Sequence, residues 1–175
     1  WSFVYDSYGD PIKTISPEDQ ITTATYNADG ELLSETSPRG NLPGADPGSF
    51  TTKVTYNPLG EATSTTDPLG DTTSYSYDLA GRLVSTTDPS GNTTTYTYSP
   101  LNQLLSLTQS YGTTDPVTTS YSYGPRGNLI KETNGAGEVT AYSYGILGNL
   151  DTSVDPLGHI TSCSYNAAGE LTSTV

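Results

Sequence analysis

Aromatic or apolar residues alternate with short hydroxyl residues in segments of about six residues along the chain. Each segment ends on a Tyr, which we call the anchor, and Tyr77 is the anchor of one copy. Tyr75 and Thr73 lie two and four positions before it, with Ser74 and Ser76 between them. A period of two is typical of strands that present one set of residues to each face. We therefore expect strands with a tyrosine face (the anchor and the residues two and four before it) and a hydroxyl face (the intervening Ser and Thr).

The anchors recur at a fixed spacing. Successive anchors lie 21, 30, 21, 21, 25, 21 and 21 residues apart, and they are Tyr5, Tyr26, Tyr56, Tyr77, Tyr98, Tyr123, Tyr144 and Tyr165. The two longer intervals are explained by insertions at residues 41–49 and near Thr113 to Pro116. Such periodicity indicates a repeat architecture, so residues 1–175 are expected to be one array of about eight repeats.

Two turn signals divide each repeat. The first turn follows the anchor, as in Asp78 to Gly81, and the second turn lies ten residues further on, as in Asp88 to Gly91. Asp bonds the N–H groups ahead of it, Pro presets φ, and Gly accepts the positive φ of a bulged exit. An apolar residue comes six positions after most anchors and is expected on the tyrosine face: Leu32, Leu83, Leu104, Leu129, Leu150 and Leu171.

Short strands joined by tight turns predict an all-β fold. Gly and Pro interrupt the chain about every ten residues, which disfavours helices. Tandem antiparallel β-hairpins of about 21 residues would form one ribbon, and its twist would curl it into a segment of a shell, barrel or fibre.

The net charge of the chain limits which classes of partner it is expected to bind. Six Lys and Arg against 19 Asp and Glu give a net charge of −13, which disfavours nucleic acid and anionic membrane surfaces. No apolar stretch approaches the roughly 18 residues of a membrane helix. The chain begins at Trp1 and contains no Met, which is typical of an excised or processed piece of a larger protein. The single Cys163 excludes an intramolecular disulfide.

The residues Tyr-Asp-Leu-Ala-Gly-Arg-Leu from Tyr77 to Leu83, followed by Thr-Asp-Pro-Ser-Gly from Thr87 to Gly91, resemble the YD repeat of RHS proteins and teneurins. The resemblance implies a ribbon that spirals into a hollow shell, which in bacterial members often encloses a C-terminal toxin. It implies a non-catalytic wall segment of a large secreted or cell-surface protein, with neighbouring repeats of the same or another chain, or an enclosed toxin domain, as partners. The self-cleaving element of RHS cores is not matched, because Asp155 to Gly158 continues into His159.

The remaining candidate catalytic or metal-binding residues are expected to have structural roles. His159 is the only His and is expected to face solvent, and Cys163 replaces a packing residue of its repeat. The Asp residues that open second turns (Asp67, Asp88 and Asp155) come one to a repeat without a calcium-loop pattern, so they are interpreted as turn caps. No enzyme activity, cofactor or metal is predicted.

Two alternatives remain open. Rows of aromatic residues on a sheet can stack on sugar rings, so a glycan-binding adhesive module would use Tyr75, Tyr96, Tyr121 and Tyr142. The competing interpretation is that these residues pack a thin core. A self-assembling extracellular fibre is the other alternative, since terminal strands have unpaired edges. Asn92 begins a possible glycosylation motif, Asn-Thr-Thr.

Overall fold

A computed structural model describes residues 1–112 and 115–175 of the chain and confirms the all-β class. These residues form sixteen strands, and they divide into two compact units, Trp1–Gly91 and Asn92–Val175. No helix in the described ranges is long and apolar enough to cross a membrane. The tandem hairpins expected from the repeat are present in both units, which are described in turn.

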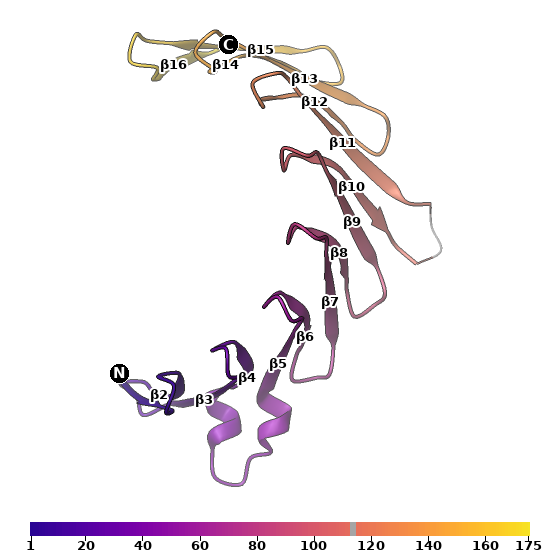
Figure 1. Ribbon diagram of the computed structural model, residues 1–175. Helices are drawn as coiled ribbons and strands as arrows, with labels where there is room; N and C mark the ends of the chain where they lie inside the picture. The colour runs from indigo at the N-terminus through magenta and orange to yellow at the C-terminus, as the bar shows by residue number, and fades with distance from the viewer. Residues whose placement is uncertain (113–114) are drawn as a thin grey trace. The chain divides into compact units, whose positions relative to one another are not determined.

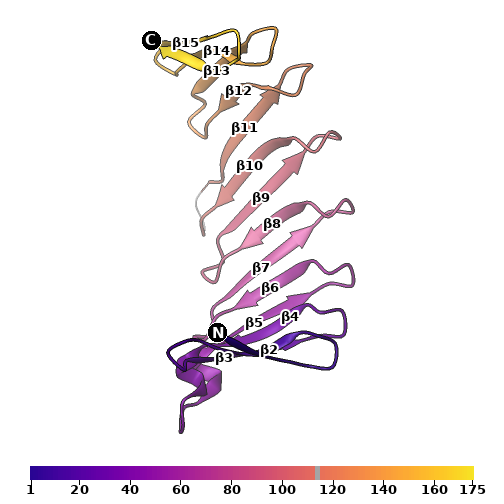
Figure 2. The ribbon, with the colours of Figure 1, turned by 90° about the vertical axis from the view of Figure 1, so that its left-hand side faces the viewer.

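The first unit is an open, single-layer antiparallel sheet in which each strand lies beside its neighbour in sequence (Figures 1 and 2). Its strands are β1 (Ser2–Tyr5), β2 (Pro11–Ile15), β3 (Ile21–Tyr26), β4 (Leu32–Thr36), β5 (Thr51–Tyr56), β6 (Ala62–Thr66), β7 (Thr72–Tyr77) and β8 (Leu83–Thr87). Two short 3-10 helices, η1 (Pro38–Asn41) and η2 (Pro47–Phe50), lie between β4 and β5.

The second unit repeats the same meander (Figure 2). Its strands are β9 (Thr93–Tyr98), β10 (Leu104–Ser110), β11 (Val117–Tyr123), β12 (Leu129–Thr133), β13 (Val139–Tyr144), β14 (Leu150–Val154), β15 (Ile160–Tyr165) and β16 (Leu171–Thr174).

The register places each anchor Tyr opposite the apolar residue that follows it by six positions. Tyr77 pairs with Leu83 after a bulge that leaves Val84 without a partner, because Ser76 pairs with Ser85. Directly opposed residues of an antiparallel pair point to the same face. The Leu row and the anchors therefore share the tyrosine face, as predicted, and the same pairing recurs at Tyr26–Leu32, Tyr98–Leu104, Tyr123–Leu129, Tyr144–Leu150 and Tyr165–Leu171.

The first turns adopt the chemistry that their residues predict. The Asp78 Oδ1 atom accepts hydrogen bonds from the N–H groups of Ala80 (2.9 Å) and Arg82 (3.1 Å), and the Gly81 N–H bonds the Asp78 carbonyl at 3.0 Å. Gly81 leaves the turn with φ of 76°, a region that side chains disfavour. Asn102 takes this place in its own repeat with φ of 62°, as Asn tolerates better than most residues.

The hydroxyl face consists of Ser and Thr side chains that hydrogen-bond across the strands. Thr25 and Ser34 are directly opposed, and their hydroxyls lie 2.7 Å apart. Equivalent pairs at 2.7–2.8 Å join Thr36 to Thr51, Thr55 to Ser64, Thr66 to Thr72, Thr97 to Ser106, Thr108 to Thr118, and Ser143 to Thr152. Cross-strand hydroxyl pairs of this kind stabilise a sheet by a few tenths of a kcal/mol each.

The insertion at 41–49 lies at a second turn, as expected. Its ends belong to η1 and η2, two short 3-10 helices that the sequence pattern did not indicate. Asp46 begins η2 by accepting the Gly48 N–H at 3.1 Å. Of the other predicted insertion, near Thr113 to Pro116, residues 113 and 114 lie outside the described residues.

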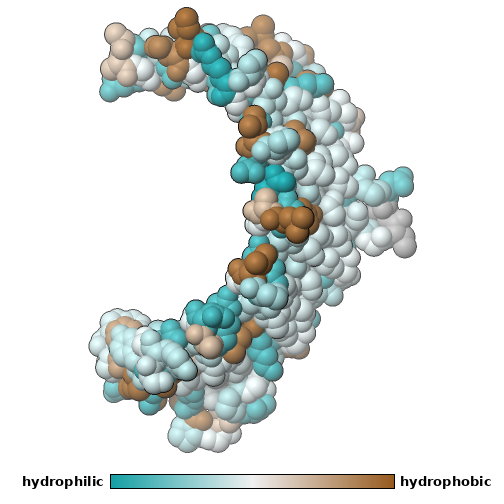
Figure 3. Space-filling view, in the orientation of Figure 1, coloured by the Kyte–Doolittle hydropathy of each residue, from teal (hydrophilic) through white to brown (hydrophobic). Residues whose placement is uncertain are grey.

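A single layer leaves both faces of each sheet in contact with solvent. No apolar residue of the described chain is buried, and Thr36, 9% exposed, is the one polar residue that is. The Leu residues of the tyrosine face are half-buried, and Leu171 is 56% exposed. Figure 3 shows apolar patches among strand surfaces of intermediate hydropathy, and the exposed large apolar side chains include Leu59, Leu79 and Leu157 in turns. The tyrosine face is therefore only partly buried.

Candidate functional site

The four tyrosines proposed as a stacking surface occupy equivalent positions on the tyrosine face. Tyr96, Tyr121 and Tyr142 lie on β9, β11 and β13 of the second unit, each separated from the next by one strand. Tyr75 has the same place on β7 of the first unit. All four side chains are half-buried, so they are neither fully packed in a core nor fully exposed to solvent. Glycan binding by this row stays a prediction.

The residues opposite these tyrosines differ from repeat to repeat. Tyr96 pairs with Leu107, Tyr142 pairs with Ser153, and Tyr121 pairs with Glu132. Burial, and then the charge of Glu132, raises the pKa of both Tyr121 and Tyr142 above its ordinary value. The row is therefore chemically uneven, with a carboxylate near two of its phenols.

Two of the anchor tyrosines, Tyr56 and Tyr123, join consecutive repeats through their hydroxyls. The Tyr56 hydroxyl donates to the Leu32 carbonyl at 3.0 Å, and the Tyr123 hydroxyl donates to the Leu104 carbonyl at 2.9 Å. Each acceptor belongs to the repeat before the anchor. The sequence analysis placed these rings on the correct face but did not predict the hydrogen bond. Its acceptor is a backbone carbonyl, which every residue has, so the residue type does not reveal it.

In seven turns the first and fifth residues form complementary side-chain pairs. The Asn27 and Asn57 amides donate to Glu31 and Glu61, each at 2.6 Å, after their Oδ1 atoms have accepted the turn N–H groups. Other pairs are Asp78–Arg82, Ser99–Gln103, Asn134–Glu138, Asp155–His159 and Asn166–Glu170. The sequence analysis missed this pairing, which an alignment of the repeats at these two positions would have revealed.

The fifth residue of a first turn also contacts the first turn of the next repeat. A Cβ atom on Gly60 would lie 2.6 Å from a Glu31 carboxylate oxygen, and one on Gly81 would lie 2.9 Å from Glu61. The Gln103 amide donates to the Gly127 carbonyl at 3.2 Å. Glycine is favoured at these turns by its positive φ, and a Cβ atom there would also displace the end of the neighbouring side chain.

Charge on the strands is divided between the faces. Lys131 is opposed to Ser122 and Ala141 on the hydroxyl face, whereas Glu132 is opposed to Tyr121. Lys13 and Lys53 also lie on the hydroxyl face, and Glu35 lies on the tyrosine face, by the register of their pairs. The tyrosine face therefore holds carboxylates without a lysine to neutralise them.

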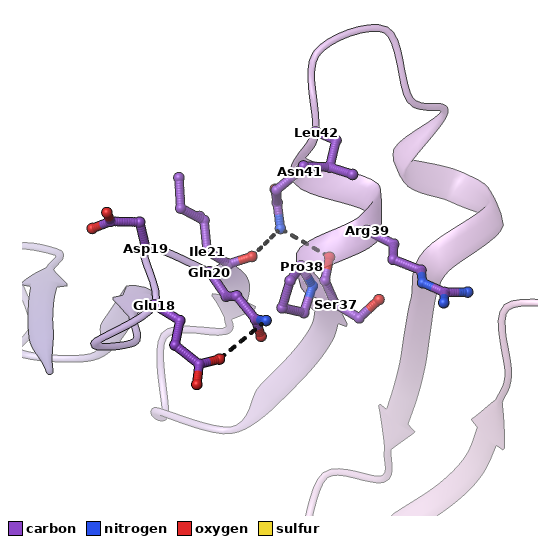
Figure 4. Close-up of a pocket in the computed structure, with 9 residues that line it drawn as sticks. All are labelled: Glu18, Asp19, Gln20, Ile21, Ser37, Pro38, Arg39, Asn41 and Leu42. Atoms are coloured by element: carbon purple, nitrogen blue, oxygen red, sulfur yellow. Dashed lines mark hydrogen bonds between the residues drawn. The ribbon is translucent and has the colours of Figure 1, made fainter.

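A recess of about 570 Å³ lies between η1 and the second turn at Glu18–Gln20 (Figure 4). One wall is fixed by Asn41, whose amide donates to the carbonyls of Ile21 (3.0 Å), Thr36 (3.1 Å) and Ser37 (3.2 Å). This amide is saturated by backbone, so it offers no donor to a ligand. The Arg39 side chain points away from Glu18 in Figure 4, so the two charges do not converge on the recess.

The other candidate residues lie apart from one another. His159 is 72% exposed and its Nδ1 atom lies 2.7 Å from the Asp155 carboxylate, in line with the expected solvent-facing position. Cys163 is half-buried and opposed to Thr174. The Asp67 Oδ1 atom accepts two turn N–H groups, which is the capping role assigned to it. Within the described ranges no three His, Cys, Asp or Glu gather as metal ligands would. Asn92 is half-buried at a second turn, and its glycosylation stays a prediction.

Solved structures share this fold. A TcdB2-TccC3 complex matches 98% of the chain with a TM-score of 0.63 and 18% identity, and the chain covers 11% of that structure. A Tc holotoxin pore from Photorhabdus luminescens gives a TM-score of 0.50 at 16% identity, again over 98% of this chain and 12% of the other. The chain thus spans about a tenth of the length of these structures.

Sequence comparison identifies the repeat itself. The curated proteins give no significant match. The sequence profile described as RHS Repeat matches residues 56–93, 77–114 and 125–160, which together span more than half of the chain. The matched stretches contain the anchors Tyr56, Tyr77, Tyr98 and Tyr144, each with the first turn that follows it. The chain belongs to the RHS repeat family.

Proposed function

We propose that the chain is a structural, non-catalytic wall segment of a larger secreted or cell-surface RHS protein, and that residues 1–175 form one array. The observation that carries this proposal is the equivalence of contacts from repeat to repeat. The Tyr56 and Tyr123 hydroxyls bond the preceding repeat, and the side chains of Glu31, Glu61 and Gln103 in first turns meet the next first turn. Contacts that recur along an array build a continuous scaffold, since each repeat is stabilised by its neighbours.

The proposed role of the wall is to enclose a toxin cargo. The fold that the chain shares with the TcdB2-TccC3 complex supports a wall architecture. The toxin cargo is our proposal. Enclosure predicts that, in the full-length protein, a segment outside the repeats resists protease until the repeat region is cut. Immediate digestion of that segment at its free-chain rate would contradict the enclosure.

Electron microscopy of the full-length protein provides the architectural test. A wall segment predicts discrete hollow particles at every protein concentration. Filaments that lengthen with concentration would instead support the fibre alternative, in which strand edges of separate chains pair. Recovery of the protein from culture supernatant or from the cell surface, rather than from the cell interior, tests the proposed location.

Glycan binding is a second candidate, favoured by the half-exposed row of Tyr96, Tyr121 and Tyr142 on alternate strands. Aromatic rings in a row suit a neutral polysaccharide, whose sugar rings stack on them. A glycan array with the purified chain tests this role. Tyr96→Leu should weaken any binding, whereas Tyr111→Leu, which lies outside the row, should leave it unchanged. Equal loss in both variants would argue against the row.

A further inference from the structure

Glu132 lies between two tyrosines on the tyrosine face of the second unit. Tyr121 on β11 is directly opposed to Glu132, and Thr140 on β13 is opposed to it from the other side. Tyr142 follows Thr140 by two residues, so it is the diagonal neighbour of Glu132 on the same face. Opposed and diagonal side chains are within reach of one another when they are long or aromatic.

The Glu132 carboxylate forms no ion pair with any residue that the structure describes. Among the described residues the ion pairs are Arg82–Asp78 and His159–Asp155, and Glu132 takes part in neither. The adjacent Lys131 lies on the opposite face. Glu132, Tyr121 and Tyr142 are all half-buried. A carboxylate that has lost part of its hydration without gaining a partner attracts a positive charge more strongly than one in open water.

The neighbouring rings select among positive ligands. Calcium takes six to eight oxygen ligands, and magnesium takes one or two carboxylates together with further oxygen ligands, whereas Glu132 offers a single carboxylate. Among the described residues no three His, Cys, Asp or Glu gather as metal ligands would. The faces of tyrosine rings attract ammonium and guanidinium groups, and this attraction adds to that of a carboxylate. Burial and the charge of Glu132 also raise the pKa of both phenols, which places the carboxylate within electrostatic reach of both rings.

We propose that Tyr121, Glu132 and Tyr142 form a binding site for an organic cation, with a quaternary ammonium or guanidinium group held between the two rings at the carboxylate. The site needs only the second unit and does not depend on the role of the chain as a wall. Its ligand differs from that of the glycan candidate, because a neutral sugar gains nothing from the charge of Glu132.

The chain contains a matched control for the carboxylate. Glu35 occupies the same place in its repeat, nine residues after its anchor, and lies on the tyrosine face of the first unit. Its opposed neighbours are Ala24 and Thr52, so it lacks the two aromatic side chains that flank Glu132. Binding that needs both the carboxylate and the rings should therefore depend on Glu132 and not on Glu35.

The test is a titration of the intact chain with tetramethylammonium chloride, followed by NMR of the tyrosine ring signals, with sodium chloride at equal ionic strength as reference. We expect saturable shifts of the Tyr121 and Tyr142 signals. Glu132→Gln should weaken the affinity about tenfold, as loss of one charged contact at a partly desolvated site predicts. Glu35→Gln should leave it unchanged.

Each remaining outcome would overturn the site. Shifts that do not saturate, shifts reproduced by sodium, or equal weakening in Glu132→Gln and Glu35→Gln would show that the cation is only attracted to the acidic chain in general. Equal shifts with neutral methyl glucoside would show that binding at this surface does not depend on the positive charge of the ligand. Glu132→Gln keeps the size of the side chain, and unchanged amide spectra in its own sheet confirm that folding is not the cause.

Discussion

At the scale of single residues, the repeat is stabilised by hydrogen bonds more than by burial. Anchor hydroxyls reach backbone carbonyls, turn side chains cap N–H groups, and hydroxyls pair across strands. Such bonds contribute from a few tenths of a kcal/mol, for the cross-strand hydroxyl pairs, to about 1.5 kcal/mol each, so the repeated set matters more than any one member.

The anchor hydroxyl can be tested by removing its oxygen. Tyr123→Phe should lower the free energy of unfolding by about 1 kcal/mol, because the Leu104 carbonyl loses its donor. Tyr144→Phe is the control, since its hydroxyl has no hydrogen-bond partner in the described residues and its ring occupies the same position one repeat later. Urea unfolding curves give both values. Equal losses would mean that the ring environment, and not the bond, determines the effect.

The half-buried Leu row gives a second test, because partial burial limits the free energy of unfolding that each leucine contributes. Leu104→Ala should cost about 1–2 kcal/mol, below the loss of a fully buried leucine, because its side chain is already partly hydrated. Ser76→Ala on the hydroxyl face should change stability by less than about 0.5 kcal/mol. Chemical denaturation measures both. Similar losses in the two variants would show that the two faces contribute alike.

The Asp78–Arg82 pair predicts a local pH dependence. The side-chain hydrogen bond from Arg82, 2.7 Å from Nε to Oδ2, holds the pKa of Asp78 below its ordinary value. The unfolded value is about 3.9, so the turn is fully stabilised above that pH and loses stability as pH falls through the lowered pKa. The protection factor of the Arg82 amide against hydrogen exchange, corrected for the intrinsic exchange rate at each pH, should therefore fall in acid. Asp78→Asn, which cannot change charge, should remove this acid dependence.

At the scale of strands and turns, periodicity made most of the fold predictable. The 21-residue spacing and the alternation before each anchor gave the strands, the turns and the face of each residue, because a one-residue slip would reverse every side chain. The side-chain contacts between neighbouring repeats were not predicted. The Gln103 contact with Gly127 and the charge of Glu132 beside Tyr142 depend on which strands are neighbours, information that a pattern within one strand lacks. The 3-10 helices of residues 38–50 belong to an insertion with no counterpart in other repeats.

The two kinds of turn should differ in their tolerance of added residues. Four glycines inserted after Ser90, in a second turn, should cost less than the same insertion after Ala80, in a first turn. Each insertion lengthens a surface loop and breaks the cap of its own turn, and an insertion already exists at a second turn at 41–49. Only the insertion after Ala80 also displaces Gly81 from Glu61 of the preceding repeat, whereas nothing lies against Gly91. Thermal unfolding of the two variants provides the comparison. Equal melting temperatures would contradict the difference between the turns.

At the scale of the whole molecule, each unit is a single layer, and its described residues form no buried apolar core. Alternation predicted which face each side chain takes but carried no information on what covers that face. Most domains bury apolar side chains between two layers. The stability of this chain must therefore come from strand pairing distributed along the repeats.

The missing core predicts a small heat capacity of unfolding. A globular protein of 175 residues would show about 2.1–2.6 kcal/mol/K, and this chain should fall clearly below that range because it exposes less new apolar surface. Differential scanning calorimetry measures the quantity, with sedimentation velocity to confirm that the sample is monomeric. A value within the globular range for a monomer would show that the two faces are covered in solution.

The division of charge between the faces has a practical consequence for anyone who immobilises or labels this protein. Lys13, Lys53 and Lys131 are all of its lysines, and every one projects from the hydroxyl face. Coupling through side-chain amines therefore attaches the sheets by that face and leaves the tyrosines toward the solution. A sensor surface prepared by lysine chemistry would thus present the tyrosine face in a uniform orientation within each unit, and a dye on lysine would report on the opposite side from any ligand bound there.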